Sequence, residues 1–93
     1  MSEIISATTS AATSSTFTVS SPVSLQVTSL SQQEFCQLQF QYNSSGGWFP
    51  CTSIGNEGRI TMEMQPVLIA GPGTYRLLKP VTGNAVAAAV ESQ

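Results

Sequence analysis

The chain has 93 residues, only 9% of them charged, and a formal net charge of −2. This length suits one small domain. Three basic residues are too few to neutralise a phosphate backbone, so the sequence argues against nucleic acid as a partner. No apolar run approaches the roughly 18 residues of a membrane-spanning helix, and the first residues lack the basic and apolar regions of a secretory signal. We therefore expect neither a membrane partner nor secretion.

The N-terminal segment differs in composition from the rest of the chain. Residues 6–16 are rich in Ser, Thr and Ala, without glycine or charge, and the apolar pair Ile4 and Ile5 precedes them. We expect residues 1–16 to form an extended arm and residues 17–93 a folded domain. An ordered arm without a core of its own must lie against another surface. The sequence leaves open whether that surface belongs to its own domain or to a neighbouring subunit, which Ile4 and Ile5 would contact.

From Phe17 onward, apolar residues recur at every second position. The pattern is clearest at residues 36–42, where three glutamines alternate with apolar side chains. Such alternation predicts strands with one buried face, and turn residues recur about every ten positions. The chain is therefore predicted to be all-β, a small antiparallel β-sandwich or barrel of seven to eight short strands. The expected strands are residues 16–21, 23–28, 36–42, 48–54, 59–64, 67–69, 74–79 and 85–90, with 43–47 as a hairpin loop.

The sequence allows further predictions for three of these strands. Pro50 places the strand 48–54 at a sheet edge or a bulge. In 59–64, Ile60, Met62 and Met64 are expected to face inward. The segment 85–90 fits a last strand better than a short helix, because the stretch is short for a helix and valines flank its alanines.

The strand 74–79 holds two of the three basic residues. Tyr75 and Leu77 should face one side and Arg76 the other. Arg76 is then either a solvent-exposed charge or a contact residue for a partner, a role that arginine often fills. Lys79 shares the side of Tyr75, but it lies at the strand end, where its ammonium group is expected to reach solvent.

Few residues suggest chemistry. The sequence has no His and no Asp, and its five Glu residues are scattered, so we expect no enzyme activity, no metal site and no cofactor. Cys36 and Cys51 flank the hairpin at 43–47. A disulfide between them is one alternative, and buried reduced thiols are the one we favour, because Cys36 falls on the apolar side of its strand.

Trp48 and Phe49 are adjacent and must face opposite sides of their strand. One ring should enter the core, and the other should be at least partly exposed. An exposed ring here would serve as a subunit anchor or as a stacking platform for a sugar.

Residues 23–90 resemble small accessory virion proteins of tailed bacteriophages. The resemblance lies in the hairpin "SLQVTSLSQQEFCQLQFQYNSSGGWFPC" and in the ending "GPGTYRLLKPVTGNAVAAAV". It implies a non-enzymatic virion protein, assembled in the host cytoplasm, that decorates or cements the capsid by binding the major capsid protein, as a homo-oligomer. The alternative is a tail- or fibre-associated protein or a carbohydrate-binding adhesive module. The candidate interface residues are Ile4, Ile5, Trp48, Phe49 and Arg76.

Overall fold

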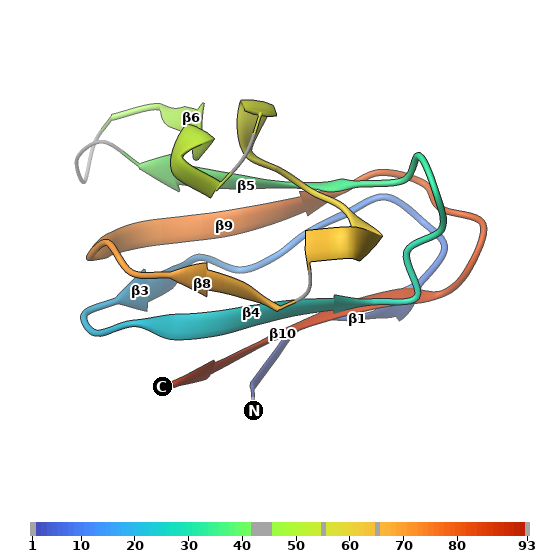
Figure 1. Ribbon diagram of the computed structural model, residues 1–93, viewed down its shortest axis with the longest axis horizontal. Helices are drawn as coiled ribbons and strands as arrows, with labels where there is room; N and C mark the ends of the chain where they lie inside the picture. The colour runs from blue at the N-terminus through green and yellow to red at the C-terminus, as the bar shows by residue number, and fades with distance from the viewer. Residues whose placement is uncertain (1, 42–45, 55, 65, 93) are drawn as a thin grey trace.

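The structure is a computed structural model that describes residues 2–41, 46–54, 56–64 and 66–92. Over these residues, two antiparallel β-sheets lie face to face as the two layers of a small sandwich (Figure 1). The predicted all-β fold is confirmed. None of the described residues belongs to a helix long and apolar enough to cross a membrane.

One layer is a four-stranded sheet with the strand order β1-β10-β4-β8. Its strands are β1 (Ser2–Thr8), β4 (Val23–Thr28), β8 (Val67–Ile69) and β10 (Val86–Ser92). The other layer is a six-stranded sheet with β9 and β5 at its centre. Its strands are β2 (Ala12–Thr13), β3 (Phe17–Val19), β5 (Cys36–Gln41), β6 (Trp48–Pro50), β7 (Arg59–Ile60) and β9 (Gly73–Lys79).

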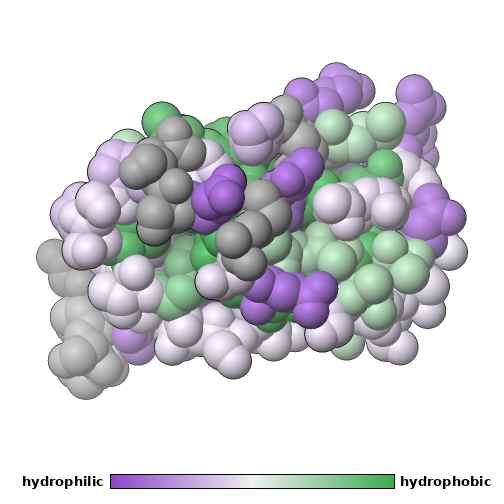
Figure 2. Space-filling model, turned by 90° about the horizontal axis from the view of Figure 1, so that it is seen from below, coloured by the Kyte–Doolittle hydropathy of each residue, from purple (hydrophilic) through white to green (hydrophobic). Residues whose placement is uncertain are grey.

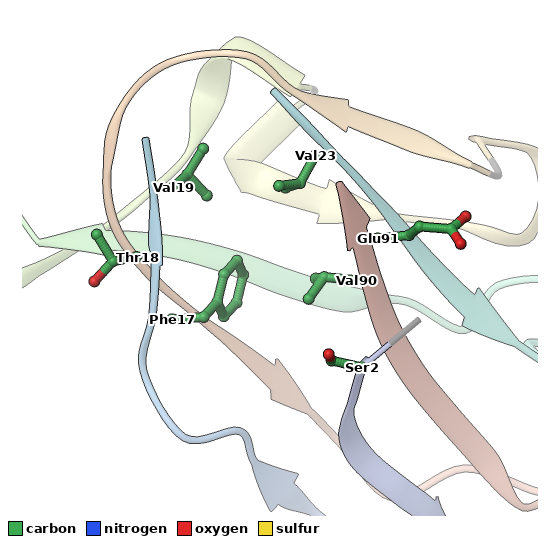
Figure 3. A pocket seen from close by; sticks show the side chains of 7 residues that line it. All are labelled: Ser2, Phe17, Thr18, Val19, Val23, Val90 and Glu91. Carbon is green, nitrogen blue, oxygen red and sulfur yellow. The ribbon is translucent and has the colours of Figure 1, made fainter. Parts of the chain in front are cut away.

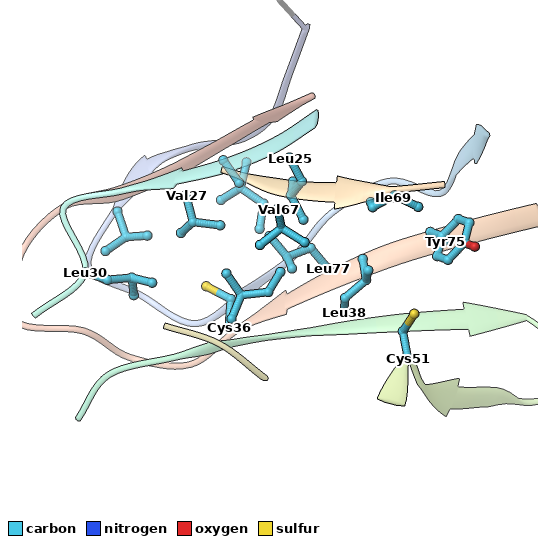
Figure 4. Packing of buried hydrophobic residues seen from close by; sticks show 14 of the residues in the cluster. Leu25, Val27, Leu30, Cys36, Leu38, Cys51, Val67, Ile69, Tyr75 and Leu77 are labelled. Atoms are coloured by element: carbon cyan, nitrogen blue, oxygen red, sulfur yellow. The ribbon is translucent and has the colours of Figure 1, made fainter. Parts of the chain in front are cut away.

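The core fills the space between the two layers (Figure 4). Leu25 on β4, Leu38 on β5 and Leu77 on β9 are completely buried. These residues have the strand parity that the sequence predicts for the inner faces. Burial of one such side chain contributes about 1.5–3 kcal/mol, so the alternating pattern stabilises this pairing of sheets.

The N-terminal segment belongs to the sandwich. β1 pairs with β10 and β2 pairs with β9, and Ile5 is only 5% exposed. The segment is extended, as expected, and of the two surfaces that the sequence left open it lies on that of its own domain. β1 also covers one side of β10, which would otherwise be an exposed sheet edge.

Three of the predicted strands are shorter than expected, and of residues 16–21 only Phe17–Val19 form β3. Residues 59–64 do not alternate through to Met64, because β7 ends at Ile60 and Met62–Met64 form a 3₁₀ helix in which Met62 is 45% exposed. The reason is topological: after β7 the chain must cross from the six-stranded sheet to β8 in the other layer. β6 ends at Pro50 and pairs only with β5, as expected of an edge strand. The hairpin residues 43–45 lie outside the described residues.

The last strand is confirmed. β10 is hydrogen-bonded to β1 on one side and to β4 on the other, so residues 86–92 are extended despite three consecutive alanines. Pairing on both sides outweighs the helix propensity of alanine, which is worth less than about 1 kcal/mol per residue.

Lys79 does not reach solvent, and the expectation that it would is wrong. It keeps the inward parity of Tyr75 and Leu77 to the end of β9 and is only 2% exposed. Its Nζ donates hydrogen bonds to the carbonyl oxygens of Ser10 (2.7 Å) and Pro80 (3.0 Å). The loops at this end of the sandwich therefore surround the ammonium group.

Candidate functional site

The outward side of the six-stranded sheet gathers aromatic, amide and cationic side chains. The register explains the grouping, since Gln39 lies opposite Arg76, Gln41 opposite Trp48, and Gln37 opposite Arg59. Side chains opposite each other across antiparallel strands lie on the same side of the sheet. We call this surface the outer face and define it by Phe35, Gln37, Gln39, Gln41, Trp48, Arg59, Thr74 and Arg76.

Arg76 is held in place by two neighbours. Its guanidinium carbon lies 4.5 Å from the centroid of the Trp48 ring, and its Nε donates a 2.8 Å hydrogen bond to Gln39 Oε1. A cation over an indole at a partly exposed site contributes about 0.5–1 kcal/mol. These contacts fix the plane and the direction of the guanidinium group.

The glutamines extend this order along β5. Gln39 Nε2 donates to Gln37 Oε1 at 3.0 Å, and Gln37 Nε2 donates to the backbone carbonyl of Glu57 at 3.0 Å. Gln41 Nε2 donates to the carbonyl of Gly46 at 3.1 Å. Side chains fixed in this way would lose little conformational entropy if a partner bound to the outer face.

A second arginine stacks on a second aromatic ring of the same face. The Arg59 guanidinium lies 4.4 Å from the centroid of Phe35, and its Nη2 is 2.9 Å from Glu57 Oε2. The outer face therefore carries two arginine–aromatic pairs, joined through the hydrogen bonds of Gln37 and Gln39.

Trp48 and Phe49 lie on opposite sides of β6, as predicted, but neither belongs to the buried core. Trp48 is half-buried beneath Arg76 on the outer face. Phe49 is 51% exposed, with its ring centroid 6.2 Å from that of Phe40. The expectation that one ring enters the core is wrong, because β6 is an edge strand that pairs with the last residues of β5, at the margin of the sandwich.

The other candidate residues lie elsewhere. Ile4 is half-buried and packs against the core, and the burial of Ile5 leaves it almost no surface for a partner. Both lie on β1, in the opposite layer from Trp48 and Arg76. Figure 2 shows the molecule from the side of that layer, where the surface is mainly pale and the strongly hydrophilic residues form separate groups. Only Trp48 and Arg76 of the five candidates come together.

Hollows open at the margins of the sandwich among the described residues. One of about 420 Å³ lies between the layers, where Phe17 and Val19 face Val23 and Val90 (Figure 3). A second, of about 340 Å³, is lined by Phe40, Cys51, Pro72 and Tyr75, among others.

Tyr75 is fixed beside the second hollow. Its hydroxyl donates a 2.7 Å hydrogen bond to the carbonyl of Gly71. Burial, and to a smaller extent the neighbouring Cys51, raises the pKa of the Tyr75 hydroxyl. Tyr75 is therefore a neutral hydrogen-bond donor that holds the turn before β9.

Both cysteines are free and buried, as we favoured from the sequence. Figure 4 shows Leu38 between them in the core. Burial raises the pKa of the Cys36 thiol to about 11, which keeps it protonated and poorly reactive at neutral pH. No three potential metal ligands of the His, Cys, Asp and Glu types lie together among the residues that the structure describes.

The sequence could indicate the polar side of β5 but not its partners. The alternation of Gln37, Gln39 and Gln41 marks an outward row, whereas the role of Phe35, Arg59 and Glu57 depends on the register between β5 and β7. That register is set by tertiary structure. Comparisons of the chain with protein-family models, with curated proteins and with solved structures found no match.

Proposed function

We propose that this chain is a non-enzymatic structural protein of a virus particle, which decorates or cements the capsid by binding the major capsid protein through the outer face. The observation that carries the proposal is the Trp48–Arg76 pair, fixed by Gln39 on the outer face of the six-stranded sheet. Trp and Arg are the residues that most often dominate the binding energy of protein interfaces.

The size and the charge of the molecule support this proposal. Its principal extents are 34 × 27 × 22 Å, so its broad side is of the order of the ~800 Å² that one partner contributes to a standard interface. Because only 9% of the residues are charged, electrostatic repulsion between copies of the chain does little to prevent their association. A low charge suits a protein that is held among many copies on a particle. The resemblance of residues 23–90 to accessory virion proteins directs the proposal to the capsid.

The experiment is co-sedimentation with shells assembled from the major capsid protein that is encoded with this chain. The wild type should sediment with the shells, and Trp48→Ala should lose most of the binding. Phe49→Ala is the matched control, since Phe49 is a neighbouring aromatic residue on the other side of β6, and it should bind as the wild type does. Absence of wild-type binding, or equal binding by Trp48→Ala, would contradict the proposal.

One observation favours a second function, that of a carbohydrate-binding module. The ring of Phe49 is half-exposed beside Phe40, and exposed aromatic rings stack on sugars. A glycan array separates the two functions. Binding of a glycan that Phe49→Ala abolishes, with attachment to shells unchanged, would assign a carbohydrate site to the other side of β6.

A further inference from the structure

The three cations of the chain differ in what they contact. The Lys79 ammonium is buried against two carbonyl oxygens, and Arg59 forms an ion pair with Glu57. Arg76 forms no ion pair with any carboxylate of the described residues, although it is well ordered by Trp48 and Gln39. Arg76 is thus a guanidinium group that is fixed in position without an anion from the described residues.

The contacts of Arg76 with the residues that the structure describes leave one edge of its guanidinium group available. Trp48 covers a face of the group, and Gln39 accepts the hydrogen bond of Nε. The two terminal nitrogens form the edge that remains, and they are spaced to donate two parallel hydrogen bonds to a carboxylate.

Arg59 shows what such an edge binds within this molecule. Like Arg76, it lies over an aromatic ring of the outer face, and it contacts the Glu57 carboxylate through a terminal nitrogen. Both sites thus place a guanidinium group over an aromatic ring, and at Arg59 the chain itself supplies a carboxylate.

We infer that Arg76 is a binding site for a carboxylate presented by the partner protein, an Asp or Glu side chain that docks on the outer face beside Trp48. The identity of the partner rests on the proposed function, whereas the carboxylate chemistry rests on Arg76 alone. A carboxylate fits better than a phosphate, because the neighbours of Arg76 are uncharged amides and the chain carries a net charge of −2.

The test is a titration of the ¹⁵N-labelled protein with a hexaglutamate peptide that is acetylated at its N-terminus and amidated at its C-terminus, with hexaglutamine capped in the same way as the uncharged probe. The chain has a single Trp and two Arg residues, so the indole N–H and the two arginine Nε–H resonances report on each site separately. Hexaglutamate should produce saturable shifts at Trp48 and Arg76, with smaller shifts at Arg59. Hexaglutamine should produce none.

Two variants sharpen the test. Arg76→Gln keeps a polar side chain and should weaken hexaglutamate binding roughly tenfold or more, as expected for the loss of a charged hydrogen-bond pair. Glu57→Gln removes the internal carboxylate, so Arg59 should gain a hexaglutamate response. Absence of saturable shifts in the wild type, or equal responses to both peptides, would overturn the inference.

The shell assay separates this inference from the proposed function. If shells bind the wild type and Arg76→Gln equally, the partner does not use a carboxylate at Arg76, and the capsid function still stands. If hexaglutamate binds at Arg76 but shells bind no form of the protein, the capsid function fails and the carboxylate site stands.

Discussion

Glu34 connects two loops at one end of the sandwich. Its carboxylate accepts hydrogen bonds from the backbone N–H of Gly83 at 2.8 Å and of Ser31 at 2.9 Å. These bonds, led by that of Gly83, lower the pKa of Glu34 from its ordinary value. The carboxylate form is therefore the one that stabilises the fold.

This geometry predicts a defined pH dependence. Because the pKa of Glu34 is lower in the folded than in the unfolded protein, its contribution is complete above the unfolded pKa and is lost as the pH falls through the folded pKa. Glu34→Gln should lower the urea midpoint at neutral pH, and its difference from the wild type should shrink in acid. A difference that is independent of pH would contradict this role.

The thiols give a second prediction at this scale. Both cysteines are buried, and burial raises the pKa of Cys36 to about 11, so neither thiol should react with an aromatic disulfide reagent in the folded protein at mildly alkaline pH. Both should react after unfolding in guanidinium chloride without a reductant. Loss of reactive thiols in the unfolded, unreduced sample would instead indicate a disulfide.

The sequence predicts reliably to which side of a strand a side chain points. It predicts less well which residues surround that side chain. The outward direction of Arg76 follows from strand parity and is confirmed. The burial of Lys79 depends on the loop at Ser10, which is 69 residues away along the chain and which no local pattern places at the strand end. The same limit applies to Trp48, whose contact with Arg76 requires two strand pairings to be in register.

At the scale of elements, Gly58 is placed where no other residue fits. Its φ is +69°, and an added Cβ would lie 2.6 Å from the carbonyl oxygen of Leu38 and 2.8 Å from the nitrogen of Cys51. Those two backbone groups are hydrogen-bonded to each other at 2.9 Å. The turn before β7 therefore packs directly on β5.

Gly58→Ala should destabilise the fold by about 2–4 kcal/mol, from the strained φ and from the collision with backbone that cannot move aside. Gly47→Ala is the matched control, because a Cβ at Gly47 would meet nothing within 4 Å. Urea unfolding of both variants measures the difference. Similar stability of the two variants would exclude this close packing.

The sequence predicted elements well where a strand has one buried face and poorly where the chain changes layers. Residues 36–41 form β5 with the expected parity, whereas 59–64 become a short strand and a 3₁₀ helix. Apolar residues recur at alternate positions in both segments. The two segments differ because the chain after residue 60 must cross to β8 in the other sheet. That crossing is a property of the topology and leaves no local pattern in the sequence.

For the whole molecule, the proposed function predicts a large gain in stability on assembly. A partner present at about 100 times its dissociation constant adds about 2.7 kcal/mol, which for a domain of this size raises the melting temperature by about 10–20 °C. Scanning calorimetry of free and shell-bound protein measures this shift, and Trp48→Ala should show little of it. Equal melting temperatures for free and bound wild type would count against the capsid role.

The two layers also determine where the ends of the chain lie. Ser2 is paired with Val90, so β1 begins close to where β10 ends, on the side of the four-stranded sheet (Figure 1). The outer face belongs to the opposite layer. A reporter or antigen fused to either terminus would project away from a surface bound through Trp48 and Arg76. If the protein docks through the outer face as proposed, the fold offers a scaffold for displaying cargo on a particle, and a terminal biotin would immobilise the protein with that face free.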